Sequence, residues 1–231
     1  MAGSALHTLL AAAALAALGG CDRLAPGTGL PAFAGFESRC ESLPAARFDV
    51  VTAPVEAKED YSLAYVEIAR LAEPSSAQHR TVGLTHAKFG YRSTLDLEGL
   101  EDPRRGRVCA RARVRVEVTT APMTVYVARE YRGDPCREPL IVEHERRHVE
   151  VFETYAAESA TRLARELDER IGGAVRYAST MAEAQQAIRA ELAAHLEAFM
   201  AEARADLALR HAAIDTPEEY EKLARECGPT R

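Results

Sequence analysis

The stretch Pro139–Gly173, PLIVEHERRHVEVFETYAAESATRLARELDERIGG, decides the fold predicted for this chain. Between its first proline and its last two glycines it contains neither residue type, and the helix-forming residues Ala, Glu, Leu and Arg dominate it. Pro139 suits the first turn of a helix, and Gly172-Gly173 suit its end. The sequence therefore predicts one long helix from Leu140 to Ile171.

Two further helices are expected downstream. Ser179 can cap a second helix from about Met181 to Ala213, whose apolar residues recur at helical spacing. The segment Asp215-Thr216-Pro217 is typical of a helix cap followed by proline at the first helical position, and it predicts a short third helix ending at Cys227. The first two helices should form a hairpin.

Strand patterns fill the region upstream, residues 47–131. In VCARARVRVEVTT, residues 108–120, apolar residues alternate with polar ones, so one face of a strand should be buried. Residues 123–131 predict another strand, residues 81–97 predict one or two, and residues 63–71 fit either a helix or a strand. We expect one α+β domain over residues 46–231, with a small, mostly antiparallel sheet (46–131) followed by the helices (139–227).

Composition limits the classes of partner. The chain has 231 residues, 47% of them hydrophobic and 28% charged, as in folded soluble proteins. The net charge is −6, and no basic run is present that could follow a phosphate backbone. We therefore expect no nucleic-acid partner.

The N-terminus is typical of an export signal. The first twenty residues contain no Asp, Glu, Lys or Arg, and the apolar run Leu9–Leu18 is too short to span a membrane. Leu18-Gly19-Gly20-Cys21 resembles the bacterial lipobox, which implies a signal peptide over residues 1–20, a lipid on Cys21 and a tether over residues 21–45. The chain would then be lipid-anchored in the cell envelope, on the periplasmic face of the inner or outer membrane. The alternative is a conventionally cleaved leader, with Cys21 an ordinary cysteine.

The four remaining cysteines predict two disulfides, because their number is even and an exported protein meets an oxidising compartment. Three connectivities are open. We favour Cys109–Cys136, which would clip a strand to the loop before the long helix, together with Cys40–Cys227, which would tie the two ends.

The long helix carries His144-Glu145-Arg146-Arg147-His148, a His-Glu-x-x-His motif. On a helix the two histidines lie about 40° and about 6 Å apart, so both imidazoles can reach one Zn²⁺ ion. Glu145 would then act as general base on a zinc-bound water. The alternative is a charged helix with i,i+4 ion pairs, in which the motif is degenerate or coincidental and the chain is a non-catalytic lipoprotein that serves as an interaction module.

The motif and the strands before it, about residues 80–160, resemble the bacterial families of predicted secreted zinc-dependent proteases of the gluzincin type. This resemblance implies a zinc metallopeptidase with His144 and His148 as ligands, Glu145 as catalytic base, and a peptide or protein substrate in the cell envelope. It also implies that the strand at 123–131 is the sheet edge along which an extended substrate binds. Arg146, Arg147 and Glu150 depart from the uncharged pattern of such motifs. On a helix Arg146 should point about 180° and Arg147 about 80° from the middle of the histidine face, so neither has to enter the site.

A third zinc ligand has to come from another element, and gluzincins take a Glu from a later helix. If the hairpin turns near residue 175, position 146 faces position 204 on the second helix. Glu202 is therefore the expected third ligand, with Asp206 beside it as a second-shell or alternative ligand. Three other candidates are kept open: Glu197, His195 and His86.

Overall fold

The structure is a computed structural model that describes residues 35–72 and 81–228. The expected signal peptide, Cys21 and the first part of the tether lie outside the described residues. From Gly35 onward the chain forms one compact unit.

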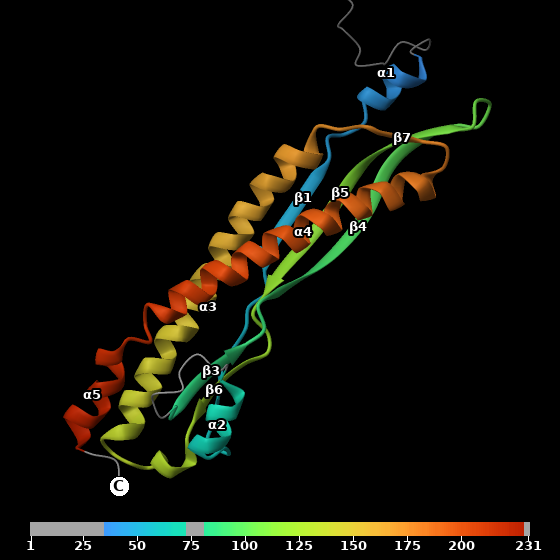
Figure 1. Ribbon diagram of the computed structural model, residues 1–231. Helices are drawn as coiled ribbons and strands as arrows, with labels where there is room; N and C mark the ends of the chain where they lie inside the picture. Colours follow the sequence, from blue (N-terminus) through green and yellow to red (C-terminus); the bar gives the residue numbers. More distant parts are fainter. Residues whose placement is uncertain (1–34, 73–80, 229–231) are drawn as a thin grey trace, which may run out of the picture. The chain divides into compact units, whose positions relative to one another are not determined.

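Four strands form the larger sheet: β1 (Arg47–Thr52), β4 (Gly90–Asp102), β5 (Arg107–Thr119) and β7 (Arg176–Ala178). β5 is central, parallel to β1 and antiparallel to β4, and its first residues also pair with β7 (Figure 1). The alternation in β5 has the predicted effect, because the side chains at every second position from Val108 to Val118 are buried.

A second, smaller sheet contains β2 (Lys58–Asp60), β6 (Met123–Val127) and β3 (Gly83–Ala87) in that order. β6 is the middle strand, parallel to β2 and antiparallel to β3. The expectation that the strand at 123–131 forms the sheet edge is therefore wrong. The edge strand that contacts the long helix is β3, because its Gly83 and Thr85 meet Glu145.

The helices after the sheets are α3 (Arg137–Leu167), α4 (Met181–Ala212) and α5 (Pro217–Cys227). A π-helical turn, Asp168–Gly172, prolongs α3. Thr180, and not Ser179, caps α4, because its hydroxyl accepts a hydrogen bond from the Glu183 N–H. Thr216 caps α5 in the same way, with Pro217 at the first helical position as predicted. Two short helices, α1 (Phe36–Glu41) and α2 (Tyr65–Leu71), precede them.

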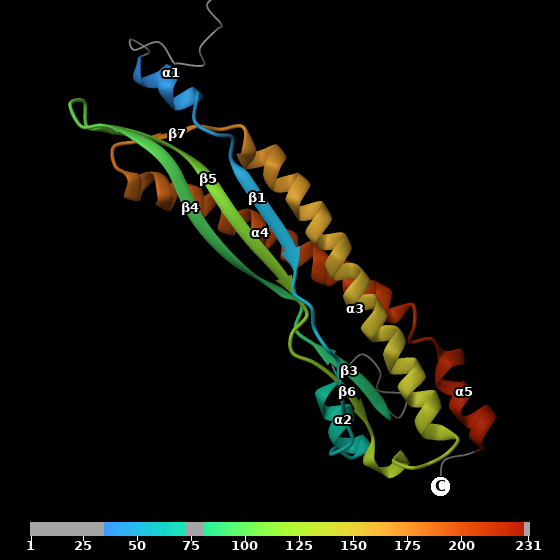
Figure 2. The same cartoon turned by 180° about the vertical axis from the view of Figure 1, so that it is seen from behind.

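The α+β class and the helical hairpin are confirmed. α3 and α4 lie on the same side of the larger sheet and cross each other (Figures 1 and 2). Their apolar faces and the inner face of β5 form the main core, in which Leu163, Leu167, Ile188 and Leu196 are almost completely buried. The sheet region differs in detail from the prediction, because it forms two sheets that each contain one parallel pair. Residues 63–71 form mainly the helix α2.

Two disulfides are present, but their pairing differs from the expected one. The bonds are Cys40–Cys109 and Cys136–Cys227, not Cys109–Cys136 and Cys40–Cys227. The reason is the length of β5. From Cys109 the strand extends to Thr119, about 30 Å at about 3.3 Å per residue, before the chain continues toward α3. Cys109 thus lies beside α1, while Cys136 lies beside the end of α5.

Among the described residues, no helix is both long and apolar enough to cross a membrane.

Candidate metal centre

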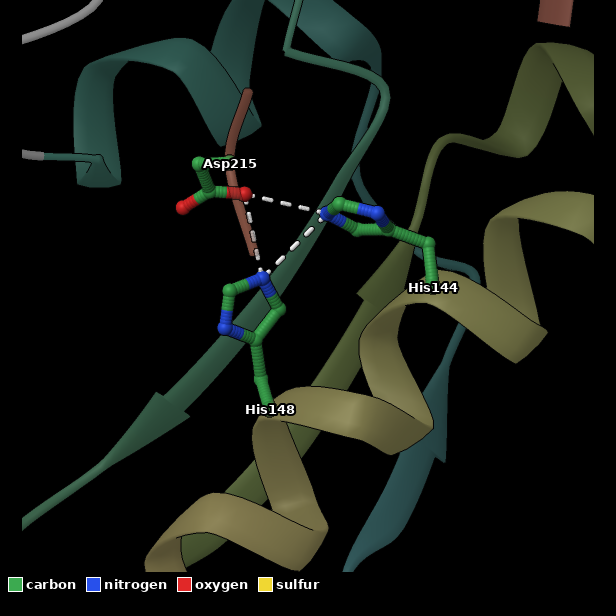
Figure 3. Close-up of side chains that lie close together, drawn as sticks. All are labelled: His144, His148 and Asp215. Atoms are coloured by element: carbon green, nitrogen blue, oxygen red, sulfur yellow. Dashed lines mark hydrogen bonds and ion pairs between the residues drawn. The ribbon is translucent and has the colours of Figure 1, made fainter. Parts of the chain in front are cut away.

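The first half of α3 and the turn between α4 and α5 bring three potential ligand atoms together (Figure 3). His144 Nε2 lies 3.0 Å from Asp215 Oδ1, and His148 Nε2 lies 3.1 Å from the same oxygen. The two Nε2 atoms are 3.2 Å apart. The three atoms therefore form a nearly equilateral triangle.

This triangle has about the size of a ligand set around a tetrahedral metal ion. Ligand atoms at about 2.0–2.1 Å from a tetrahedral ion are separated from one another by about 3.3 Å. In the part of the chain that the structure describes, His144, His148 and Asp215 are the one group of three His, Cys, Asp or Glu side chains close enough to share a metal ion. This group could hold a metal ion with little movement of the side chains.

Asp215, and not the expected Glu202, is the carboxylate at the histidine pair. The difference follows from where the hairpin is centred. The ring contact of Phe152 with His211 and the ion pair of His195 with Glu166 place the centre near residue 181, not near 175. A shift of six residues moves the position opposite residue 146 from 204 to about 216, next to Asp215. The shift arises because the chain crosses the end of the sheet as β7 before α4 begins.

The other candidate ligands lie elsewhere. Glu202 and Glu197 are exposed on α4. His195 pairs with Glu166 at 3.4 Å, and Asp206 pairs with Arg210 at 3.5 Å. His86 is exposed on β3. The signal that could have identified Asp215 is its position at the start of the third helix, where the sequence predicts only a cap.

Glu145 is buried between α3 and β3, with an exposure of only 4%. The Thr85 hydroxyl lies 2.9 Å from both the backbone oxygen and Oε2 of Glu145. A Cβ atom at Gly83 would stand 2.5 Å from Glu145 Oε1 and 2.8 Å from Ile141 Cγ2, so any larger residue here would force these buried side chains to move. Burial raises the pKa of Glu145, although the nearby histidines act in the opposite direction. A carboxylate with a raised pKa on the motif helix is suited to accepting and releasing a proton.

The charges within the group support one another. Burial alone would raise the pKa of Asp215, but its hydrogen bonds to His144 and His148 outweigh burial and lower it. Burial alone would lower the pKa of His144, but the bond to Asp215 and the charges of Glu145 and Asp215 raise it. For His211 burial prevails, and its pKa is lowered to about 4.

Further side chains contact the Nδ1 atoms of both histidines, which are the ring nitrogens outside the triangle. His148 Nδ1 lies 2.9 Å from His211 Nδ1. His144 Nδ1 lies 3.0 Å from Nη2 of Arg147, which also pairs with Glu219. Of the two motif arginines, Arg146 points outward to Glu59 as predicted. Arg147, expected about 80° from the histidine face, does reach the site, because its long side chain folds back along the helix onto His144.

Comparisons of the chain with protein-family models, with curated proteins and with solved structures find no match in any of the three.

Proposed function

We propose that this chain is a zinc metallopeptidase, anchored in the cell envelope through Cys21 and related to the predicted secreted zinc-dependent proteases. The observation that carries the proposal is the triangle of His144, His148 and Asp215, with the buried Glu145 on the same helix. Asp215 takes the place of the Glu that gluzincins use.

His144 and His148 would hold the ion through Nε2, and Asp215 through Oδ1, which leaves a fourth position for water or substrate. Zinc held in this way lowers the pKa of a bound water to about 7 and polarises a carbonyl group. Glu145 would take the proton from that water and deliver it to the leaving amine. Thr85 would keep the Glu145 carboxylate in place while it does so.

The outer edge of β3 supports a peptide as substrate. Val82 O accepts a hydrogen bond from Ala128 N, and Lys88 N donates one to Pro122 O. Since inward and outward backbone groups alternate along an antiparallel edge strand, those of Gly83, Thr85 and Ala87 face away from β6. No strand of the described residues pairs with this edge. An extended peptide can add to it as a further strand, next to Glu145.

The first test is the metal content of the purified chain by mass spectrometry. We expect about one zinc per chain, loss of zinc in His144→Ala and Asp215→Ala, and retention in Glu145→Ala. Glu202→Ala is the matched control, because it removes an exposed carboxylate from α4 and should keep the zinc. A peptide library should then be cleaved by the wild type and not by Glu145→Ala.

Absence of zinc from a folded, zinc-supplemented wild type would refute the metallopeptidase. The chain would then be a non-catalytic interaction module with a coincidental motif. Loss of zinc in Glu202→Ala with retention in Asp215→Ala would refute the ligand set alone.

A further inference from the structure

We propose that Arg147 and Glu219 control the metal centre through His144. In the metal-free protein, a hydrogen bond from Arg147 to Nδ1 holds the His144 ring in a tautomer that cannot bind metal. When metal binds, Nδ1 loses its contact with Arg147 and donates a hydrogen bond to Glu219 instead. This inference rests on the proposed metal centre and adds a positioning role for two residues outside the ligand set. The exchange of hydrogen-bond partners concerns His144 and not His148.

The first step concerns the direction of the hydrogen bond at His144 Nδ1. A guanidinium group has donors and no acceptor, so the contact with Arg147 at 3.0 Å is favourable only when Nδ1 carries a lone pair. The proton of the neutral ring then sits on Nε2, where Asp215 accepts it at 3.0 Å. In this arrangement His144 Nε2 has no lone pair to offer a metal ion.

The second step concerns the ring as a ligand. When His144 binds metal through Nε2, its proton moves to Nδ1, and an N–H of Arg147 would then face another N–H. A histidine ligand normally donates this proton to a carboxylate or a carbonyl group. Oε2 of Glu219 lies 3.7 Å from Nδ1, so a short movement makes it the acceptor.

The surroundings permit this exchange. The side chain of Arg147 is 35% exposed, and that of Glu219 is 27% exposed, so the guanidinium can move into solvent. His148 differs from His144 in this respect. Its Nδ1 faces His211 at 2.9 Å, and a neutral imidazole nitrogen can accept a proton as well as donate one. His148 can therefore bind metal without a change of partner.

The test compares Arg147→Met with Arg146→Met, which removes the neighbouring arginine of the same motif from an exposed site. Zinc affinity is measured on the full chain by competition with a chromophoric chelator. We expect Arg147→Met to bind zinc about tenfold more tightly than the wild type. Changes of this size are usual when groups that contact metal ligands are replaced, but the sign is reversed here because Arg147 opposes the metal-binding form of His144. Arg146→Met should match the wild type, and Glu219→Ala should bind more weakly.

Nitrogen-15 NMR of the imidazoles shows which ring nitrogen of His144 carries the proton. The loss of a positive charge at position 147 would not by itself transfer this proton from one nitrogen to the other. At alkaline pH the metal-free wild type should show His144 protonated on Nε2, and the zinc-loaded protein should show it protonated on Nδ1. Protonation on Nδ1 in the metal-free wild type, or equal affinities of Arg147→Met and the wild type, would overturn the exchange while leaving the metal centre standing. If neither the wild type nor Arg147→Met bound zinc, the metal centre itself would be overturned, and the exchange with it.

Discussion

The two halves of α3 bury their side chains in different ways. In the second half, Leu163 and Leu167 are completely buried against the apolar faces of α4 and β5. In the first half the buried side chains include Glu145 and His148, and each of them has a specific polar partner. Apolar burial stabilises the fold, whereas polar burial costs stability unless hydrogen bonds compensate for it. The first half therefore carries the group that could hold a metal ion, on a helix that the second half holds in place.

The largest effect that separates the two halves should come from Leu163→Ala. Replacing a completely buried leucine by alanine lowers the free energy of unfolding by about 2–5 kcal/mol. Part of this loss comes from the apolar area that is no longer buried, and part from the cavity that is left behind. Because the triangle of ligands lies at the other end of the helix, the zinc stoichiometry of the folded protein should stay the same. Denaturant unfolding and metal analysis of the same sample measure both quantities.

His148→Ala is the matched variant for this comparison. It should lose zinc while costing less stability than Leu163→Ala in metal-free protein. If Leu163→Ala abolished zinc binding in the folded state, the two halves would not be separable in this way.

The two disulfides also differ in burial, and this difference gives the second prediction. Cys40, which lies in α1, and Cys109 are completely buried, whereas Cys136 is exposed and its bond joins the start of α3 to the end of α5. α5 has no fully buried residue, and besides this bond it is tied to α3 by polar contacts such as that of Glu219 with Arg147. A thiol reductant should open Cys136–Cys227 first, and zinc should then bind more weakly because Asp215 adjoins α5 and Glu219 lies in its first turn.

Alkylation followed by mass spectrometry identifies which cysteines react first under native conditions. The variant with serine at positions 136 and 227 should lose about 2–4 kcal/mol of stability and also zinc affinity. The variant with serine at positions 40 and 109 should lose a similar stability and keep its zinc affinity when folded. Equal zinc affinity in both variants would show that α5 needs no disulfide to support the site.

Most of the fold was predictable because its signals are local. The 3.6-residue pattern of α3 and α4, the alternation of β5 and the proline at the first position of α5 each depend on residues close in sequence. That the two motif histidines lie together was predictable for the same reason, since about four residues make one helical turn.

The third ligand and the disulfide pairing depend on long-range geometry that local patterns do not contain. Asp215 reaches the histidines because β7 moves the start of α4, and β7 forms only through pairing with β5. Likewise, Cys109 is kept from Cys136 by the length of β5. Neither a six-residue shift nor the choice among three disulfide pairings has a signature within one element.

The smallest expected effect concerns Glu145 itself. Burial raises its pKa in the folded state, so the folded protein binds that proton more tightly than the unfolded chain does. Stability is therefore lost as pH rises from the unfolded value, about 4.3, through the folded one, and it remains lower at neutral pH. Glu145→Gln removes this cost and keeps an oxygen that can accept from Thr85. In metal-free protein at neutral pH we expect it to raise Tm by about 2–4 °C, as about 1 kcal/mol does in a chain of this size.

Thermal unfolding of both proteins with chelator, as a function of pH, checks this sign. The difference in Tm should shrink as pH falls below the unfolded pKa of the carboxyl group, because wild-type Glu145 is then protonated in both states. Glu150→Gln is the control, since it makes the same change on an exposed face of α3 and should leave Tm nearly unchanged. A lower Tm for Glu145→Gln at neutral pH would mean that the carboxylate stabilises the fold. The contrast between the two halves of α3 would then have to be abandoned at this residue, because Glu145 would be a structural group as well as the proposed base.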